Sequence, residues 1–205
     1  MKSTEVKAEY FMLMEYEQII KIYLNLRDHI NLIMRNYLTL IGGSLTVIVI
    51  ISQITQYNLM SYIMAYFLFI LSLIGFIALN AIIGARHDMV IYARSLNKIR
   101  SYFCEKHSQI SAFLILPVES SYPHFYEAPP RYFFWLVVLV SFLNSSLFAF
   151  GCSLINITHF PEVGVDVAKV FPILTGALML ILQILWYKYI SRKREKLFLK
   201  IFYKN

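Results

Sequence analysis

The chain carries little charge, and its longest apolar runs carry almost none. Of its 205 residues, 15% are Asp, Glu, Lys or Arg and 59% are apolar, and the mean hydropathy is +0.60. This composition excludes an ordinary soluble domain and predicts a small integral membrane protein. The apolar runs contain no Asp, Glu, Arg or His, and their only lysine is Lys188, at the end of the last run. Ion-coupled transporters and proton pumps usually keep such groups at membrane depth, so neither class is favoured.

Motifs for cofactors and metals are lacking as well. The two cysteines, Cys104 and Cys152, stand alone and form no zinc or redox motif. The sequence also has no glycine-rich phosphate-binding loop. We therefore expect no cofactor, no metal site and no enzymatic activity. We also expect no disulfide within the chain, because Cys104 is predicted in the cytoplasm and Cys152 in the membrane.

Four apolar runs are long enough to cross a bilayer core, which needs roughly 17–25 residues of helix. They cover residues 38–54, 59–83, 132–157 and 170–189. Only the four residues TQYN separate the first two runs, so these predict a tight transmembrane hairpin, and the last two runs predict a second one. The expected divisions are a stalk helix at 1–37, the first hairpin at 38–84, a second stalk helix and a loop at 85–131, the second hairpin at 132–190 and a tail at 191–205.

The placement of lysine and arginine predicts the topology of the four spans. Five of these residues precede the first span, six lie between the second and third, and seven lie from Lys188 onward. The link of the first hairpin has none, and that of the second has only Lys169. Because basic segments stay in the cytoplasm, we expect an inner-membrane protein with both termini and the middle loop on the cytoplasmic side.

Two segments beside the first hairpin show the heptad pattern of paired helices. Apolar residues recur at alternating steps of three and four, without proline or glycine, both before the first span and after the second. We expect both transmembrane helices to continue into the cytoplasm and to pair there as an antiparallel stalk. The seam positions are Tyr16, Ile19, Tyr23, Leu26, Ile30 and Ile33 in the first segment and Met89, Tyr92, Leu96, Ile99 and Phe103 in the second.

The second stalk segment also holds the one pattern that is typical of catalysis. Arg100 and His107 are separated by six residues, a spacing similar to the Arg-His motif of HEPN-type ribonucleases. These proteins carry the motif on a compact soluble helical bundle, and the sequence has no room for one. We favour a flank of the stalk, with both side chains solvated or paired with acids of the partner helix. The alternative is a weak candidate catalytic pair.

The third span carries small and polar residues at helical spacing. Ser141, Ser145, Ala149 and Ser153 recur every four residues, which lets helices pack closely in lipid. Asn144 and Asn156 add amides nearby, and an amide in hydrocarbon needs a partner. This pattern favours helix packing within the monomer for the serine and alanine row. The alternatives are an oligomer interface or the polar wall of a pore.

Two further segments flank the second hairpin. The loop at 114–130 contains four prolines, and its aromatic residues Tyr122, Phe125 and Tyr126 suit the membrane interface or, alternatively, a docking surface for a soluble partner. The tail has Lys193, Lys196, Lys200 and Lys204 on one helical face and Leu197, Phe198, Ile201 and Phe202 largely on another. We therefore expect a basic amphipathic helix on the anionic inner leaflet. The fold class is an all-α membrane protein.

The order of these elements resembles that of a group of bacterial defence proteins. A stalk helix, a tight transmembrane hairpin and a returning stalk helix with the sequence YARSLNKIRSYF cover roughly residues 10 to 110. This arrangement resembles SLATT-type and four-helix membrane effectors of anti-phage systems, and the four-span accessory proteins of RNA-targeting CRISPR systems. The resemblance is one of architecture, and no catalytic residues follow from it.

Three functions are consistent with the sequence. The resemblance implies an oligomeric effector or channel-like protein that perturbs the inner membrane during anti-phage defence. The second is a non-conducting adaptor that docks or regulates a soluble defence protein through the stalk and loop. The third is a membrane-tethered HEPN-like ribonuclease. We expect the lipid membrane and further copies of the chain as partners, and no direct contact with nucleic acid.

Overall fold

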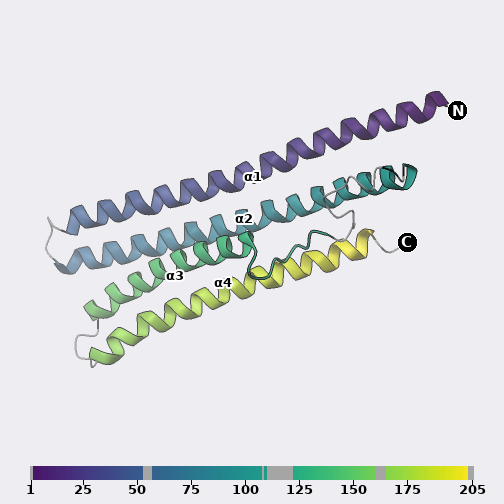
Figure 1. Cartoon of the computed structure of the whole chain (residues 1–205). Helices are drawn as coiled ribbons and strands as arrows, with labels where there is room; N and C mark the ends of the chain where they lie inside the picture. Colours follow the sequence, from purple (N-terminus) through teal and green to yellow (C-terminus); the bar gives the residue numbers. More distant parts are fainter. Residues whose placement is uncertain (1, 53–56, 108, 110–121, 160–164, 203–205) are drawn as a thin grey trace. The chain divides into compact units, whose positions relative to one another are not determined.

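The computed structural model describes residues 2–52, 57–107, 109, 122–159 and 165–202. Within these ranges the regular structure is helical and contains no strand (Figure 1). The helices are α1 (Lys2–Ser52), α2 (Tyr57–Lys106), α3 (Tyr132–His159) and α4 (Val165–Phe202). The prediction of an all-α protein built on four long helices is confirmed.

Each of the four helices contains a stretch that is long and apolar enough to cross a membrane. The first two helices are far longer than a bilayer requires, because the heptad pattern beside each apolar run continues the helix without a proline. The tail is likewise not a separate helix, since α4 continues without a break to Phe202. The predicted tail and stalk segments are thus extensions of the predicted spans.

The chain divides into two compact units. Unit 1 contains Met1–Asn31, Gly84–Phe125 and Arg194–Asn205, and unit 2 contains Leu32–Ile83 and Tyr126–Lys193. Unit 1 therefore draws together most of the two stalk segments, the proline-rich loop up to Phe125 and most of the tail. Unit 2 contains most of the four apolar stretches.

Unit 2 has an apolar exterior and a partly polar interior. Large apolar residues such as Leu73, Ile77 and Ile173 are 60%, 61% and 69% exposed. Buried polar residues come from every helix of the unit, and they include Ser44, Ser72, Ser141, Asn144, Ser145 and Gln183. A soluble bundle shows the reverse arrangement, with apolar side chains inside and polar ones outside.

Unit 1 is held together by the predicted seam and by a second cluster. Ile19 and Ile30 of α1 and Met89 and Leu96 of α2 are buried seam residues. Val90 of α2, Phe125 of the loop and Phe198 of α4 form a buried cluster, and Ile91 packs against it. The tail is therefore anchored in unit 1 by one face of its helix.

Candidate functional site

The interior of unit 2 contains a group of hydrogen-bonded polar residues from all four helices. Asn144 of α3 is at its centre and is fully buried. The Tyr37 hydroxyl of α1 donates to Asn144 Oδ1. Asn144 Nδ2 donates to Gln183 Oε1 of α4 at 3.3 Å, and the Ser72 hydroxyl of α2 donates to the Asn144 carbonyl oxygen at 3.1 Å. We call Tyr37, Ser72, Ser141, Asn144, Ser145 and Gln183 the polar cluster.

A glycine of α2 makes room for this arrangement. A Cβ atom at Gly75 would collide with Asn144 Oδ1 and with the Tyr37 hydroxyl. The absence of a side chain at this position lets α1 and α3 bring their polar groups together across α2. Because Gly75 lies inside a helix, where glycine costs roughly 1 kcal/mol relative to alanine, its benefit is the space it leaves.

Small residues allow α3 and α4 to pack closely beside the polar cluster. A Cβ atom at Gly176 of α4 would lie 2.9 Å from Ala149 Cβ and 3.3 Å from the Ser145 carbonyl oxygen. Small residues therefore meet small residues at this interface, which allows the two backbones to approach. Gln183 follows Gly176 by two helical turns and so lies on the same face of α4.

The polar residues predicted on the third span have different environments. Ser141, Asn144 and Ser145 are buried inside unit 2. Ala149 and Ser153 are half-buried, and the side chain of Asn156 lies outside the described residues. The sequence analysis missed Gln183 and Gly75. The signal for Gln183 was available, because it is the only amide within the long apolar run of α4.

The predicted pair Arg100 and His107 lines a groove in unit 1. The groove has a volume of about 450 Å³. Its lining residues are Glu9, Leu13 and Tyr16 of α1 with Ile99, Arg100, Phe103, Cys104 and His107 of the second stalk segment. The walls are mainly apolar, and the ionisable groups are engaged with one another across the groove.

Each cation beside this groove has a partner on α1. Arg100 Nη2 donates to the Tyr16 hydroxyl at 3.0 Å, and its guanidinium lies 5.7 Å from the centre of the Tyr16 ring. Lys106 Nζ lies 2.8 Å from Glu9 Oε1, and His107 Nε2 lies 3.8 Å from the same oxygen. The hydrogen bond and charge of Lys106 hold the pKa of Glu9 below its usual value, with a smaller contribution from His107. The contacts run antiparallel, because the earlier residue of α1 faces the later residue of α2.

The remaining seam residues are buried to different extents. Ile19, Ile30, Met89 and Leu96 are buried, whereas the half-buried ones are Tyr16, Tyr23, Leu26, Ile33, Tyr92, Ile99 and Phe103. Ile33 belongs to unit 2, and the others belong to unit 1.

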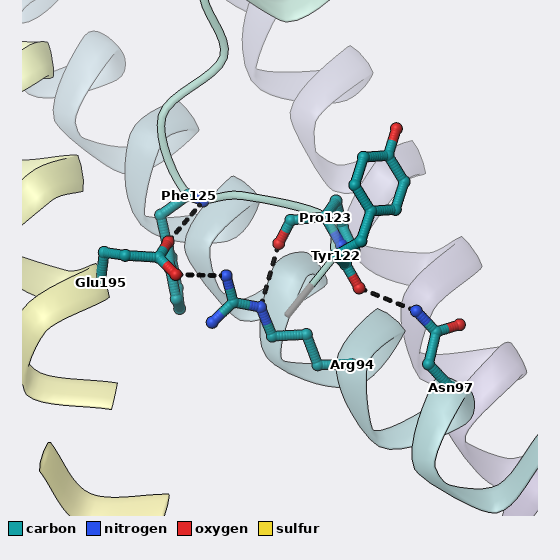
Figure 2. A network of polar contacts seen from close by, with 6 residues as sticks. All are labelled: Arg94, Asn97, Tyr122, Pro123, Phe125 and Glu195. Atoms are coloured by element: carbon teal, nitrogen blue, oxygen red, sulfur yellow. Dashed lines mark hydrogen bonds and ion pairs between the residues drawn. The ribbon is translucent and has the colours of Figure 1, made fainter. Parts of the chain in front are cut away.

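A buried arginine that the sequence analysis did not single out organises the rest of unit 1. Arg94 of α2 is 1% exposed and forms a 2.6 Å ion pair with Glu195 of α4 (Figure 2). Arg94 Nε donates to the Pro123 carbonyl oxygen at 3.0 Å. The second carboxylate oxygen of Glu195 accepts the Phe125 N–H at 3.1 Å. The loop, α2 and α4 thus meet at a single charge pair.

Aromatic rings enclose this ion pair. The Arg94 guanidinium lies 4.8 Å from the centre of the Phe125 ring and 4.7 Å from that of Phe198. Asn97, one turn further along α2, donates to the Tyr122 carbonyl oxygen at 2.8 Å (Figure 2). We call Arg94, Asn97, Glu195, Phe125 and Phe198 the arginine clamp.

The clamp changes the interpretation of two predicted surfaces. Phe125, expected at the membrane interface or on a docking surface, is 1% exposed inside unit 1. Phe198, expected to lie on the bilayer, is buried against Arg94 and Phe125. Leu197 and Ile201 remain exposed, as do Lys193, Lys196 and Lys200. The side chains of Phe202 and Lys204 and the loop residues 114–121 lie outside the described residues.

The comparisons with known proteins give no relative for the chain: no family model matches it, and neither do curated proteins or solved structures. Among the described residues, no group of three or more His, Cys, Asp and Glu side chains is placed to hold a metal ion. The candidate functional features of the chain are therefore the polar cluster, the groove and the arginine clamp.

Proposed function

We propose that this chain is a multi-pass inner-membrane protein that assembles into homo-oligomers and makes the membrane permeable. The polar cluster is the observation that carries the proposal. It is a set of hydrogen-bonding side chains, contributed by all four helices, inside a unit whose exterior is apolar. Polar residues inside an apolar bundle are costly, so they are a functional hypothesis by default when the bundle lies in lipid.

The apolar exterior of unit 2 supports membrane insertion. Leu73, Ile77 and Ile173 expose most of their surface, and exposed aliphatic side chains on this scale suit hydrocarbon better than water. The distribution of lysine and arginine supports cytoplasmic termini, because the two predicted external links hold one basic residue between them.

A role in bacterial anti-phage defence is part of the same proposal and has a separate basis. It rests on the stalk helix, hairpin and returning stalk helix, whose order resembles that of membrane effectors from such systems. In this proposal the stalk helices of unit 1 provide contacts for assembly, and the polar cluster provides the polar lining once copies associate.

A second candidate function is a non-conducting adaptor, and the groove of unit 1 favours it. The groove is within the usual volume of ligand sites, and Leu13, Tyr16, Ile99 and Phe103 give it apolar walls. A soluble protein could insert a side chain there. The ribonuclease alternative has one observation in its support, because Arg100 and His107 line the same groove.

Reconstitution separates these functions. The purified protein would be inserted into sealed liposomes that contain a potassium-sensitive dye, and its mass would be measured in detergent by light scattering. We expect an oligomer of three or more copies and a leak that rises steeply with protein density. Replacement of Asn144 and Gln183 with leucine should reduce the leak, whereas the matched control Leu139→Ala, at an exposed apolar position on α3, should not. A monomer or dimer that leaves the liposomes sealed would favour the adaptor.

A further inference from the structure

Three atoms of the polar cluster have unused hydrogen-bonding capacity. The hydroxyls of Ser141 and Ser145 and Nε2 of Gln183 are buried and have no hydrogen-bond partner among the described residues. Their residues are 0%, 4% and 2% exposed. Buried polar atoms in folded proteins nearly always have a partner, which is either another protein group or ordered water. Three such atoms in one cluster indicate that something polar belongs there.

The three atoms belong to α3 and α4, which are joined by the hydrogen bond between Asn144 and Gln183. Gln183 Oε1 accepts a hydrogen bond from Asn144, so Nε2 of the same amide lies beside the centre of the cluster. Ser141 and Ser145 precede and follow Asn144 on α3 and are one turn apart. Gly176 brings α4 close to the backbone of Ser145. The two serines therefore flank Asn144 along α3, and Gln183 contacts Asn144 from α4.

We propose that the polar cluster is a binding site for water. The free groups are one amide donor and two hydroxyls, each of which can donate and accept. Water both accepts from an amide and donates to or accepts from a hydroxyl, so it satisfies all three. A cation suits the site poorly, because Gln183 Nε2 presents hydrogen atoms and because Asn144 Oδ1 and Gln183 Oε1 already accept hydrogen bonds. The described residues of the cluster include no cationic side chain to balance an anion.

Bound water would extend a chain of hydrogen bonds that has a single direction. The Tyr37 hydroxyl donates to Asn144, Asn144 donates to Gln183, and Gln183 would donate to water, which would donate to the serine hydroxyls. The chain passes from α1 through α3 to α4 and back to α3. This inference rests on the proposed function for its membrane setting, and it names water as the species that enters the cluster and wets the interior before any leak.

The first test is whether replacement of Ser145 with alanine lowers the stability of the protein or leaves it unchanged or higher. If Ser145 binds water, Ser145→Ala should lower the thermal midpoint of the purified protein in detergent by about 2–4 °C, since water loses a partner. If the interior is dry, the same change removes an unsatisfied hydroxyl and should leave the midpoint unchanged or raise it. The matched control is Ser146→Ala, because the Ser146 hydroxyl already donates to the Phe142 carbonyl oxygen at 2.8 Å on the exposed side of α3.

The second test measures whether water-soluble molecules reach the cluster, and it remains decisive if an alanine variant fails to fold. In a background with Cys104→Ser and Cys152→Ala, Ser145→Cys would be exposed to a small water-soluble methanethiosulfonate reagent in liposomes. We expect labelling at least tenfold faster than at Leu139→Cys, an exposed apolar position of the same helix. Equal, slow labelling at both positions overturns the inference. If Ser145→Cys is labelled rapidly but the liposomes stay sealed, the proposed leak is wrong and the inference stands. If the liposomes leak but Ser145→Cys is not labelled, the inference is wrong and the leak stands.

Discussion

Arg94 of α2 and Glu195 of α4 form an ion pair of 2.6 Å inside unit 1, in which the arginine side chain is 1% exposed and the glutamate side chain 25% exposed. Each partner also holds the loop between α2 and α3. Arg94 binds the Pro123 carbonyl, and Glu195 binds the Phe125 N–H. One pair of charges therefore links both the loop and the tail to α2, beside the Asn97 hydrogen bond and the buried cluster of Val90, Phe125 and Phe198.

Replacement of one member of this pair should be severe. Arg94→Leu leaves the Glu195 carboxylate beside two aromatic rings without its cation, and breaking a buried pair in this way costs about 3–5 kcal/mol. We expect a lower thermal midpoint in detergent and faster tryptic cleavage in the tail after Lys196, because α4 would no longer be anchored there.

The matched control for the clamp is the ion pair of Arg27 with Asp28. Its atoms are 3.7 Å apart and its side chains are 60% and 69% exposed, so Arg27→Leu should have almost no effect. The double variant Arg94→Leu with Glu195→Leu should recover much of the stability that the single variant loses, since no charge is left buried. Equal tail cleavage in Arg94→Leu and wild type would show that the clamp does not hold α4.

Acidification should loosen the same region through His87. This histidine lies beyond the second apolar run, is 2% exposed, and contacts the Phe125 ring edge-on at 5.5 Å. Burial, with smaller contributions from the charges of Arg194 and Arg86, lowers its pKa to about 4. Because the folded-state pKa is below the unfolded value of about 6.5, the stability is fully present above that value and is lost as the pH falls toward 4.

The measurement is the thermal midpoint in detergent at pH 7.5 and at pH 5. We expect His87→Leu to show a smaller decrease on acidification than wild type does, because the variant has no imidazole to charge at this position. His124→Asn, at an exposed position of the loop next to Phe125, serves as the control and should retain the wild-type pH dependence. An identical decrease in wild type and His87→Leu would assign the pH dependence to other groups.

The helical architecture could be predicted because it depends on local pattern. Uncharged runs of sufficient length gave four helices, and the heptad spacing with no proline extended two of them. Gly42 and Gly43 in α1 did not end that helix, since they lie within one continuous apolar run. Individual residues of the α1 seam could also be named before their burial was known, Ile19 and Ile30 among them.

The arginine clamp could not be predicted in this way. Its members come from α2, a proline-rich loop and the tail, and no periodicity connects positions so far apart. The heptad pattern places Arg94 off the apolar seam, so it predicts a solvated side chain there. Glu195 lies among the basic residues of the tail. Asn144 was the intermediate case. Its need for a partner was evident from the sequence, but the identity of Gln183 as that partner depends on how α3 and α4 pack.

The stability of unit 1 should be sensitive to a new charge on the buried face of α1 and not on its exposed face. Ile30 of α1 is 7% exposed, so Ile30→Asp places an unpaired carboxylate among apolar side chains at a cost of several kcal/mol. Leu24→Asp on the same helix, at a position 40% exposed, should cost less than about 1 kcal/mol. Thermal midpoints in detergent would compare the two variants, and similar losses would mean that α1 has no buried face in this region.

The proposed topology predicts the side of the membrane for four fusion points. We expect Asn58 and Val163 outside the cytoplasm and His107 and Asn205 inside it, because the two links around the former pair contain only Lys169, whereas lysine and arginine are frequent around the latter pair. Alkaline phosphatase and green fluorescent protein fusions would report the two sides. Val163 and Asn205 lie outside the described residues. A cytoplasmic signal at Val163 would exclude four spans.

The Arg100 and His107 side chains should tolerate substitution if they only flank the stalk. Arg100 bonds to a tyrosine hydroxyl, and His107 is half-exposed at 3.8 Å from Glu9, so each alanine variant should lose no more than about 1 kcal/mol of stability. A ribonuclease would behave differently, because catalytic residues act as a unit. Either alanine would then abolish cleavage, and the double variant would be no worse than each single one. The assay is cleavage of a labelled single-stranded RNA by the purified protein, with Arg27→Ala as the control at an exposed stalk position. We expect no cleavage by wild type, and cleavage that either alanine removes would place a nuclease in the groove.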